Sequence, residues 1–167
     1  MLVDRSSFPE MKDARFLGPK MAGNSPQSVS PIDPPECSAL VLQTMSQSVT
    51  GGLTDGKTIM FNATIALLTE RSDFKSVVSK CGTFKVGAVT STVTQRSLPG
   101  LPEWATAILL TTSALPDITE LEVMGYYRGV LIQSGCRKKG AGDPSEQDIA
   151  SLVKIFKDQV ARLEAAP

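Results

Sequence analysis

The clearest pattern along the chain is an alternation of apolar and polar residues, which predicts several β-strands in its middle part. Residues 58–69 alternate most strongly and place five apolar residues on one face: Ile59, Phe61, Ala63, Ile65 and Leu67. Four later segments rich in threonine, valine and leucine are also predicted to be strands: 84–95, 104–112, 121–127 and 130–134. Gly87 is expected to form a bulge, and Gly129 a tight turn or a bulge.

Three segments have the apolar spacing of helices. The first is predicted to begin at Asp33, with Pro34 in the first helical position and Glu36 three residues after the cap. Its inward residues are expected to be Cys37, Leu40, Val41 and Met45. A short second helix is predicted to begin at Ser72 and to carry Phe74, Val77, Val78 and Cys81. The third begins within 143–146 and has the longest apolar stripe: Ile149, Leu152, Val153, Phe156, Val160 and Leu163.

These elements predict one α+β domain over residues 33–167, preceded by an N-terminal arm over residues 1–32. The arm contains four prolines, so we expect it to be irregular and to be held on the core by Phe8, Phe16 and Leu17. Four successive strands joined by short turns are most easily antiparallel. We therefore expect a mostly antiparallel sheet of about five to six strands, flanked by helices.

Composition excludes some classes of function. The 167 residues contain 17 Lys and Arg and 17 Asp and Glu, and a net charge of zero argues against binding to nucleic acid. The absence of histidine removes the usual general base and the commonest zinc ligand. No apolar run approaches the roughly 20 residues of a membrane helix. Because no signal peptide opens the sequence, we expect either a cytosolic protein or the mature form of an exported one.

The three cysteines bear on that choice. Cys37 and Cys81 lie on inward faces of two predicted helices, so they form either a disulfide or two buried thiols. A bridge would stabilise the fold by roughly 4 kcal/mol in the chain-entropy model. Cys136 is expected to be a free thiol. It precedes three cations, which favours a reactive thiolate, but an inert thiol at a strand end fits the sequence better.

The sequence contains no recognisable catalytic arrangement. It has no Gly-x-Ser-x-Gly motif, and the glycines at 51–52 and 140–142 lack the Gly-Lys-Ser/Thr ending of a phosphate loop. Glu120 and Glu122 share one face of a strand, which we interpret as a polar outer face opposite Leu121 and Val123. We therefore predict that the protein is not an enzyme, with no catalytic residues, no cofactor and no metal site.

A binding site is the better hypothesis. Trp104, Tyr126, Tyr127 and Arg128 are the candidate ligand-binding residues, because aromatic faces beside a cation line many ligand grooves. The alternative is that Trp104 and one tyrosine fill the core while the other tyrosine supports a strand edge. The loop over residues 97–102 is expected either to form the rim of a groove or to cap the core.

Several short motifs resemble one family. The string at 33–40, Asp-Pro-Pro-Glu-Cys-Ser-Ala-Leu, is similar to a helix start in mycobacterial secreted proteins and lipoproteins. These proteins are related to the extracellular sensor domain of certain transmembrane Ser/Thr kinases. The Cys-Gly-Thr-Phe string at 81–84 resembles the second cysteine element of that family, and residues 154–163 resemble its C-terminal helix. The Phe-Pro pair at 8–9 resembles the start of the mature domain.

The resemblance implies a Mog1/PsbP-like fold, a Cys37–Cys81 disulfide and a location in the cell envelope. It implies a ligand-binding or sensor-type domain for a small molecule, lipid, glycan or partner protein, without binding to nucleic acid. Membrane attachment is expected only through a lipid or segment before residue 1, and we expect a monomer. Three cysteines allow one internal bridge, whereas the sensor domain of the kinases has two. The alternatives are a hydrolase of unrecognised type and a cytosolic Mog1-like interaction protein with reduced thiols.

Overall fold

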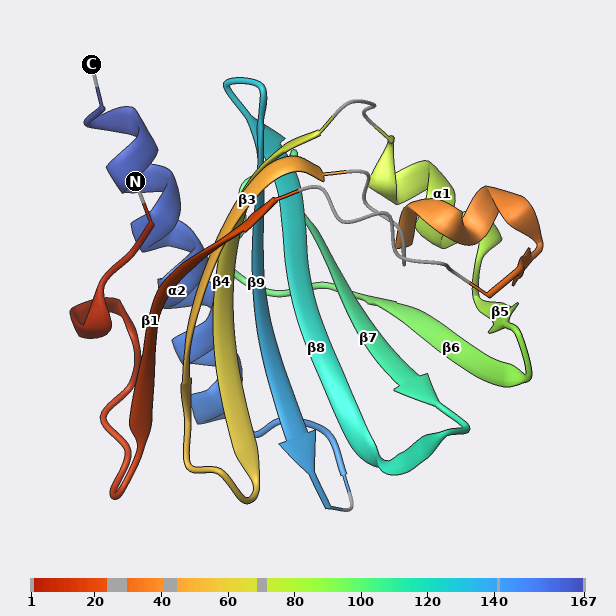
Figure 1. Cartoon of the computed structure of the whole chain (residues 1–167), viewed down its shortest axis with the longest axis horizontal. Coiled ribbons are helices and arrows are strands. Elements are labelled where there is room, and N and C mark those ends of the chain that lie inside the picture. Colours follow the sequence, from red (N-terminus) through yellow and green to blue (C-terminus); the bar gives the residue numbers. More distant parts are fainter. Residues whose placement is uncertain (1, 24–29, 41–44, 69–71, 141, 167) are drawn as a thin grey trace.

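The computed structural model describes residues 2–23, 30–40, 45–68, 72–140 and 142–166, and these form a nine-stranded antiparallel sheet with helices on both faces (Figure 1). The strand order is β1-β3-β4-β9-β8-β7-β6-β5-β2. The strands are β1 (Arg15–Gly23), β2 (Ile32–Asp33), β3 (Met45–Thr54), β4 (Ile59–Leu68), β5 (Thr83–Val86), β6 (Val89–Arg96), β7 (Thr106–Thr112), β8 (Leu115–Tyr127) and β9 (Val130–Lys139). The helices are η1 (Arg5–Ser7), η2 (Pro35–Leu40), α1 (Phe74–Lys80) and α2 (Glu146–Glu164). The predicted α+β class is confirmed, but the predicted number of strands is wrong.

Three strands were missed: β1, β2 and β3. In β1 and β3, glycine and proline obscure the strand pattern. β1 lies in the arm that we predicted to be irregular, and its register with β3 shifts between Leu17 and Lys20, around Pro19. β3 contains Gly51 and Gly52, residues that weaken a strand pattern. A Cβ atom at Gly52 would lie 2.7 Å from the carbonyl oxygen of Phe61, so the close pairing of β3 with β4 requires glycine there.

The predicted strand over 84–95 is two strands. β5 and β6 form a hairpin, in which Val86 pairs with Val89, and Gly87 lies in the turn with φ of +59°. Gly87 is therefore a turn residue and not the predicted bulge. Arg128 and Gly129 also have positive φ and form the tight turn between β8 and β9, which confirms the turn predicted at Gly129.

One core lies between α2 and the sheet. α2 packs on β9, β4 and β8. In Figure 1 this helix lies behind the sheet, at the left. Its buried residues are Leu152, Ile155, Phe156 and Gln159. The N-terminal segment completes this core through Val3 and Phe8, with Phe16 packed against it. The backbone N–H of Val3 donates to Oε1 of Gln159 at 2.9 Å, which ties the first residues to α2.

A second core lies on the opposite face, under α1 and η2. It includes Phe74 and Val78 of α1, together with Phe84, Val93 and Ile108 of the strands below. Cys37 and Cys81 are fully buried here and form a disulfide, with Cα atoms 5.7 Å apart. The predicted bridge is confirmed.

The helix starts differ in detail from the prediction. Asp33 pairs with Lys85 as part of β2, and η2 is a 3₁₀ helix in which Cys37 N–H donates to the carbonyl of Pro34 at 3.1 Å. Val41, predicted to extend this helix, lies outside the described residues, and Met45 begins β3. Asp73 and not Ser72 caps α1, because its carboxylate accepts from the N–H groups of the first turn.

Candidate functional site

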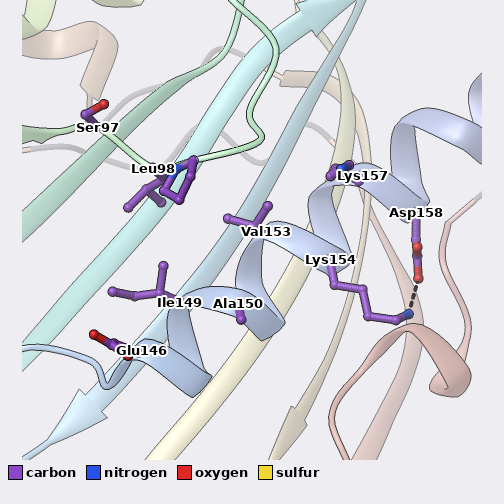
Figure 2. Close-up of a pocket in the computed structure, with 10 residues that line it drawn as sticks. Ser97, Leu98, Glu146, Ile149, Ala150, Val153, Lys154, Lys157 and Asp158 are labelled. Carbon is purple, nitrogen blue, oxygen red and sulfur yellow. Dashed lines mark hydrogen bonds and ion pairs between the residues drawn. The ribbon is translucent and has the colours of Figure 1, made fainter.

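A groove of about 680 Å³ lies between α2 and the loop that follows β6 (Figure 2). One wall is Ser97, Leu98 and Pro99, and the facing wall is a flank of α2 that includes Ile149 and Val153. In Figure 2 the side chains of Ile149 and Val153 extend from the helix on the side of Leu98. We call this site the α2 groove. Its volume is within the range of small-molecule sites.

The position of α2 follows from its local sequence. Ser145 caps the helix in a reciprocal capping box with Asp148: the Asp148 N–H donates to Ser145 Oγ at 3.2 Å, and the Ser145 N–H donates to Asp148 Oδ2 at 2.9 Å. The cap therefore lies within residues 143–146, where we predicted the helix start. Residues 149 and 153 are one turn apart, beside the buried stripe, and both line the groove.

The predicted apolar stripe of α2 is divided between the core and the α2 groove. Leu152 and Phe156 are fully buried against the sheet, whereas Ile149 and Val153 are half-buried and line the α2 groove. Ile155, which the predicted stripe omitted, is fully buried. Periodicity identifies this apolar band but cannot divide it between core and groove, because both environments select the same residue types.

The rim of the α2 groove is charged. Lys154 and Asp158 form an ion pair at 2.6 Å, one turn apart on α2. Lys157 lies nearer the loop, and a Cβ atom at Gly100 would be 3.9 Å from its Nζ. No ion pair or hydrogen bond within the described residues involves the Lys157 ammonium group. Glu146 borders the groove at the start of the helix.

The four predicted ligand-binding residues do not share one site. Trp104 stacks on Tyr127 with ring centroids 5.6 Å apart, and the guanidinium carbon of Arg128 lies over the ring of Tyr127, 5.6 Å from its centroid. Tyr126 lies on the opposite face of the sheet, where it stacks on Phe74 at 5.3 Å. Adjacent strand residues point to opposite faces, which separates the two tyrosines. None of the four lines the α2 groove, so their role in binding stays a prediction.

Trp104, Tyr127 and Arg128 instead form a cluster at the C-terminal end of α2. The indole of Trp104 also contacts Phe156, with ring centroids 5.6 Å apart. The hydroxyl of Tyr127 donates to Glu164 at 3.1 Å, and Arg128 donates to the carbonyl of Leu163 at 3.2 Å. These contacts fix the end of the helix that carries the groove.

The remaining chemically distinctive groups lie away from the α2 groove. Cys136 is buried, and desolvation raises the pKa of its thiol to about 12, so it is an inert core residue. Leu121 and Val123 are buried beneath α2, as predicted, and Glu120 and Glu122 lie on the opposite face of the sheet. Glu122 pairs there with the core residue Ile108 and is half-buried, so this face is not the polar outer face that we predicted. Within the described residues, no three metal-ligating side chains come together.

Comparison with solved structures supports the resemblance seen in the sequence. The extracellular domain of PknH from Mycobacterium tuberculosis has a TM-score of 0.53 at 12% identity, over 94% of this chain and 93% of that one. The Rv0999 ortholog from Mycobacterium smegmatis, a putative uncharacterised protein, has a TM-score of 0.50 at 11% identity, over 93% and 92% of the two chains. At these identities the similarity concerns the fold. No family model and no curated protein matches the sequence.

Proposed function

We propose that this protein is an exported, sensor-type domain of the cell envelope, with a Mog1/PsbP-like fold, that binds a small ligand in the α2 groove and has no catalytic activity. The observation that carries the proposal is the groove itself, in which apolar side chains of α2 face an apolar, proline-stiffened loop. Sites for small molecules are typically concave and mostly apolar, with a few polar groups that orient the ligand.

Two observations support export. The Cys37–Cys81 disulfide is typical of proteins that mature in oxidising compartments. The fold is similar to that of an extracellular domain over nearly the whole chain. Within the described residues, no helix is long and apolar enough to cross a bilayer.

The geometry favours binding over hydrolysis. Ser97 and Lys157 both border the α2 groove, but no hydrogen bond joins them, and Figure 2 shows them on different sides of Leu98. An activated serine needs a base within hydrogen-bonding reach. The carboxylate pair Glu120 and Glu122 lies on the other face of the sheet. The groove therefore lacks a nucleophile–base pair.

An uncharged fluorescent compound, N-phenyl-1-naphthylamine, tests whether the α2 groove binds apolar ligands. We expect a saturable rise in its fluorescence with the wild-type protein and the loss of this rise in Ala150→Trp. Ala150 is exposed on the groove wall, so the indole fills the groove without removing a core contact. The control is Ala161→Trp, which is exposed on the same helix outside the groove. Equal binding by the two variants would refute the proposed site.

A further inference from the structure

We propose that the ligand of the α2 groove is a single-chain amphiphile with an anionic head group. Its head would lie beside Lys157, and its chain would lie along Leu98, Ile149 and Val153. This inference rests on the proposed function of the groove and names the chemical class of its ligand. The argument has three parts: the walls, the distribution of charge and the length of the groove.

The walls favour a flexible hydrocarbon chain. Leu98 and Pro99 face Ile149 and Val153, and Ala150 adds a small apolar surface between the helix turns. The aromatic residues of the molecule pack elsewhere, because Trp104 and Tyr127 stack on each other and Tyr126 on Phe74. A groove with aliphatic walls and no aromatic face offers little to a sugar ring or a planar ring system, but it suits methylene groups.

The charges favour an anion at one end. The Lys154 ammonium is neutralised by Asp158, and Figure 2 shows this pair on the side of α2 away from Leu98. Lys157 has no such partner within the described residues, and its Nζ reaches the loop at Gly100. Lys157 is thus a cation available to a ligand at the junction of helix and loop. Glu146, on the same flank at the start of α2, would repel an anion at the other end.

The spacing of these two charges sets the length and direction of the ligand. Glu146 and Lys157 are eleven positions apart, which corresponds to about 16 Å along a helix axis. An extended chain of about 12 carbons is roughly 14 Å long and spans most of that distance. An amphiphile with its head at Lys157 would therefore place its chain over Val153 and Ile149 and end near Glu146.

Two amphiphiles with opposite head groups and equal chains test the inference: dodecanoate and dodecyltrimethylammonium, both below the concentrations at which they form micelles. Binding is followed by amide chemical shifts in ¹⁵N-labelled full-length protein, which also locate the site. We expect dodecanoate to shift the amides of residues 97–100 and 146–158 and to bind at least about tenfold more tightly than the cation.

Lys157→Glu is the decisive variant. It should weaken dodecanoate binding by about tenfold, because it removes an attraction and adds a repulsion, and it should reverse the order of the two amphiphiles. Lys12→Glu makes the same change in net charge at an exposed residue outside the groove, and it should change the dodecanoate affinity by less than about twofold.

The outcomes separate this inference from the proposed function. Equal binding of both amphiphiles in the groove, or equal effects of Lys157→Glu and Lys12→Glu, would overturn the anionic head group and leave an apolar binding site. Shifts that map outside residues 97–100 and 146–158 would overturn the inference as well. The absence of binding by both amphiphiles and by the uncharged fluorescent compound would overturn the inference together with the function of the groove.

Discussion

At the scale of single residues, Gly125 determines how the only tryptophan packs. A Cβ atom at this position would lie 2.7 Å and 2.8 Å from two carbons of the Trp104 ring, so the indole lies directly on the β8 backbone. We expect Gly125→Ala to destabilise the protein by about 1–3 kcal/mol, because the ring must move from its stack with Tyr127. Urea unfolding followed by tryptophan fluorescence measures both effects.

The matched control is Gly18→Ala. A Cβ atom at Gly18 would meet nothing within 4 Å, and its backbone does not have positive φ. An equal loss of unfolding free energy in the two alanine variants would contradict this prediction. It would mean that the contact with Trp104 is not the reason for glycine at position 125.

Glu122 gives the protein a pH-dependent stability. Burial, and secondly the charge of Glu120, raise the pKa of this carboxyl group from 4.5 to about 7, although Gln133 and Arg137 partly offset the shift. Because the folded-state pKa is raised, this contribution to stability is present below pH 4.5 and is lost as the pH rises through 7. Glu122→Gln should therefore stabilise the protein at pH 8 by roughly 1–2 kcal/mol, since the half-buried side chain retains some solvent screening.

Urea unfolding of Glu122→Gln and wild type at pH 4 and pH 8 measures this difference. The two proteins should have similar stability at pH 4, where Glu122 is mostly protonated in both states. Glu10→Gln removes an exposed carboxylate and is the control, expected to follow the wild-type curve. A gap between Glu122→Gln and wild type that does not change with pH would contradict the raised pKa.

At the scale of elements, the disulfide joins η2 to α1 across a sequence separation of 44 residues. These short helices have few turns of their own, so the bridge and the core beneath them hold them on the sheet. The double variant Cys37→Ala/Cys81→Ala should lose roughly 4 kcal/mol of unfolding free energy in the chain-entropy model. Cys136→Ala, which removes a buried thiol without a bridge, should lose less and serves as the control.

Thiol titration checks the same bond without mutation. The wild-type protein unfolded without reductant should have one reactive thiol, from Cys136, and three after reduction. Three thiols before reduction would exclude the disulfide and remove one of the two supports for export.

At the scale of the whole molecule, the α2 groove exists because the sheet is wider than the helix that covers it. Nine strands span roughly 38 Å at the usual strand spacing, whereas a helix covers about 10 Å. α2 covers β4, β9 and β8, and its other flank is held by the N-terminal segment through Gln159 and Arg162. The flank with Ile149 and Val153 is left facing the loop after β6 (Figure 2).

The sequence determined the elements whose pattern is local. The strand over 58–69 and the last two strands were predictable because alternation is a property of neighbouring residues. The C-terminal helix was predictable because its apolar stripe and its cap lie within 22 positions of one another. The disulfide followed from the family resemblance, since the spacing of Cys37 and Cys81 alone left two possibilities. β1 and β3 were missed because Pro19, Gly51 and Gly52 interrupt the alternation of apolar and polar residues. The strands nevertheless form, because they pair with their neighbours in the sheet.

Only the tertiary structure decided the order of the strands and the site between α2 and its facing loop. Leu98 and Val153 are 55 positions apart in the sequence, and neither carries a mark of ligand binding. An apolar residue is selected equally by a core and by an apolar groove, so composition and periodicity cannot separate the two. The separation depends on which surfaces the rest of the chain covers, and that is settled only when the strands have paired and the helices have packed.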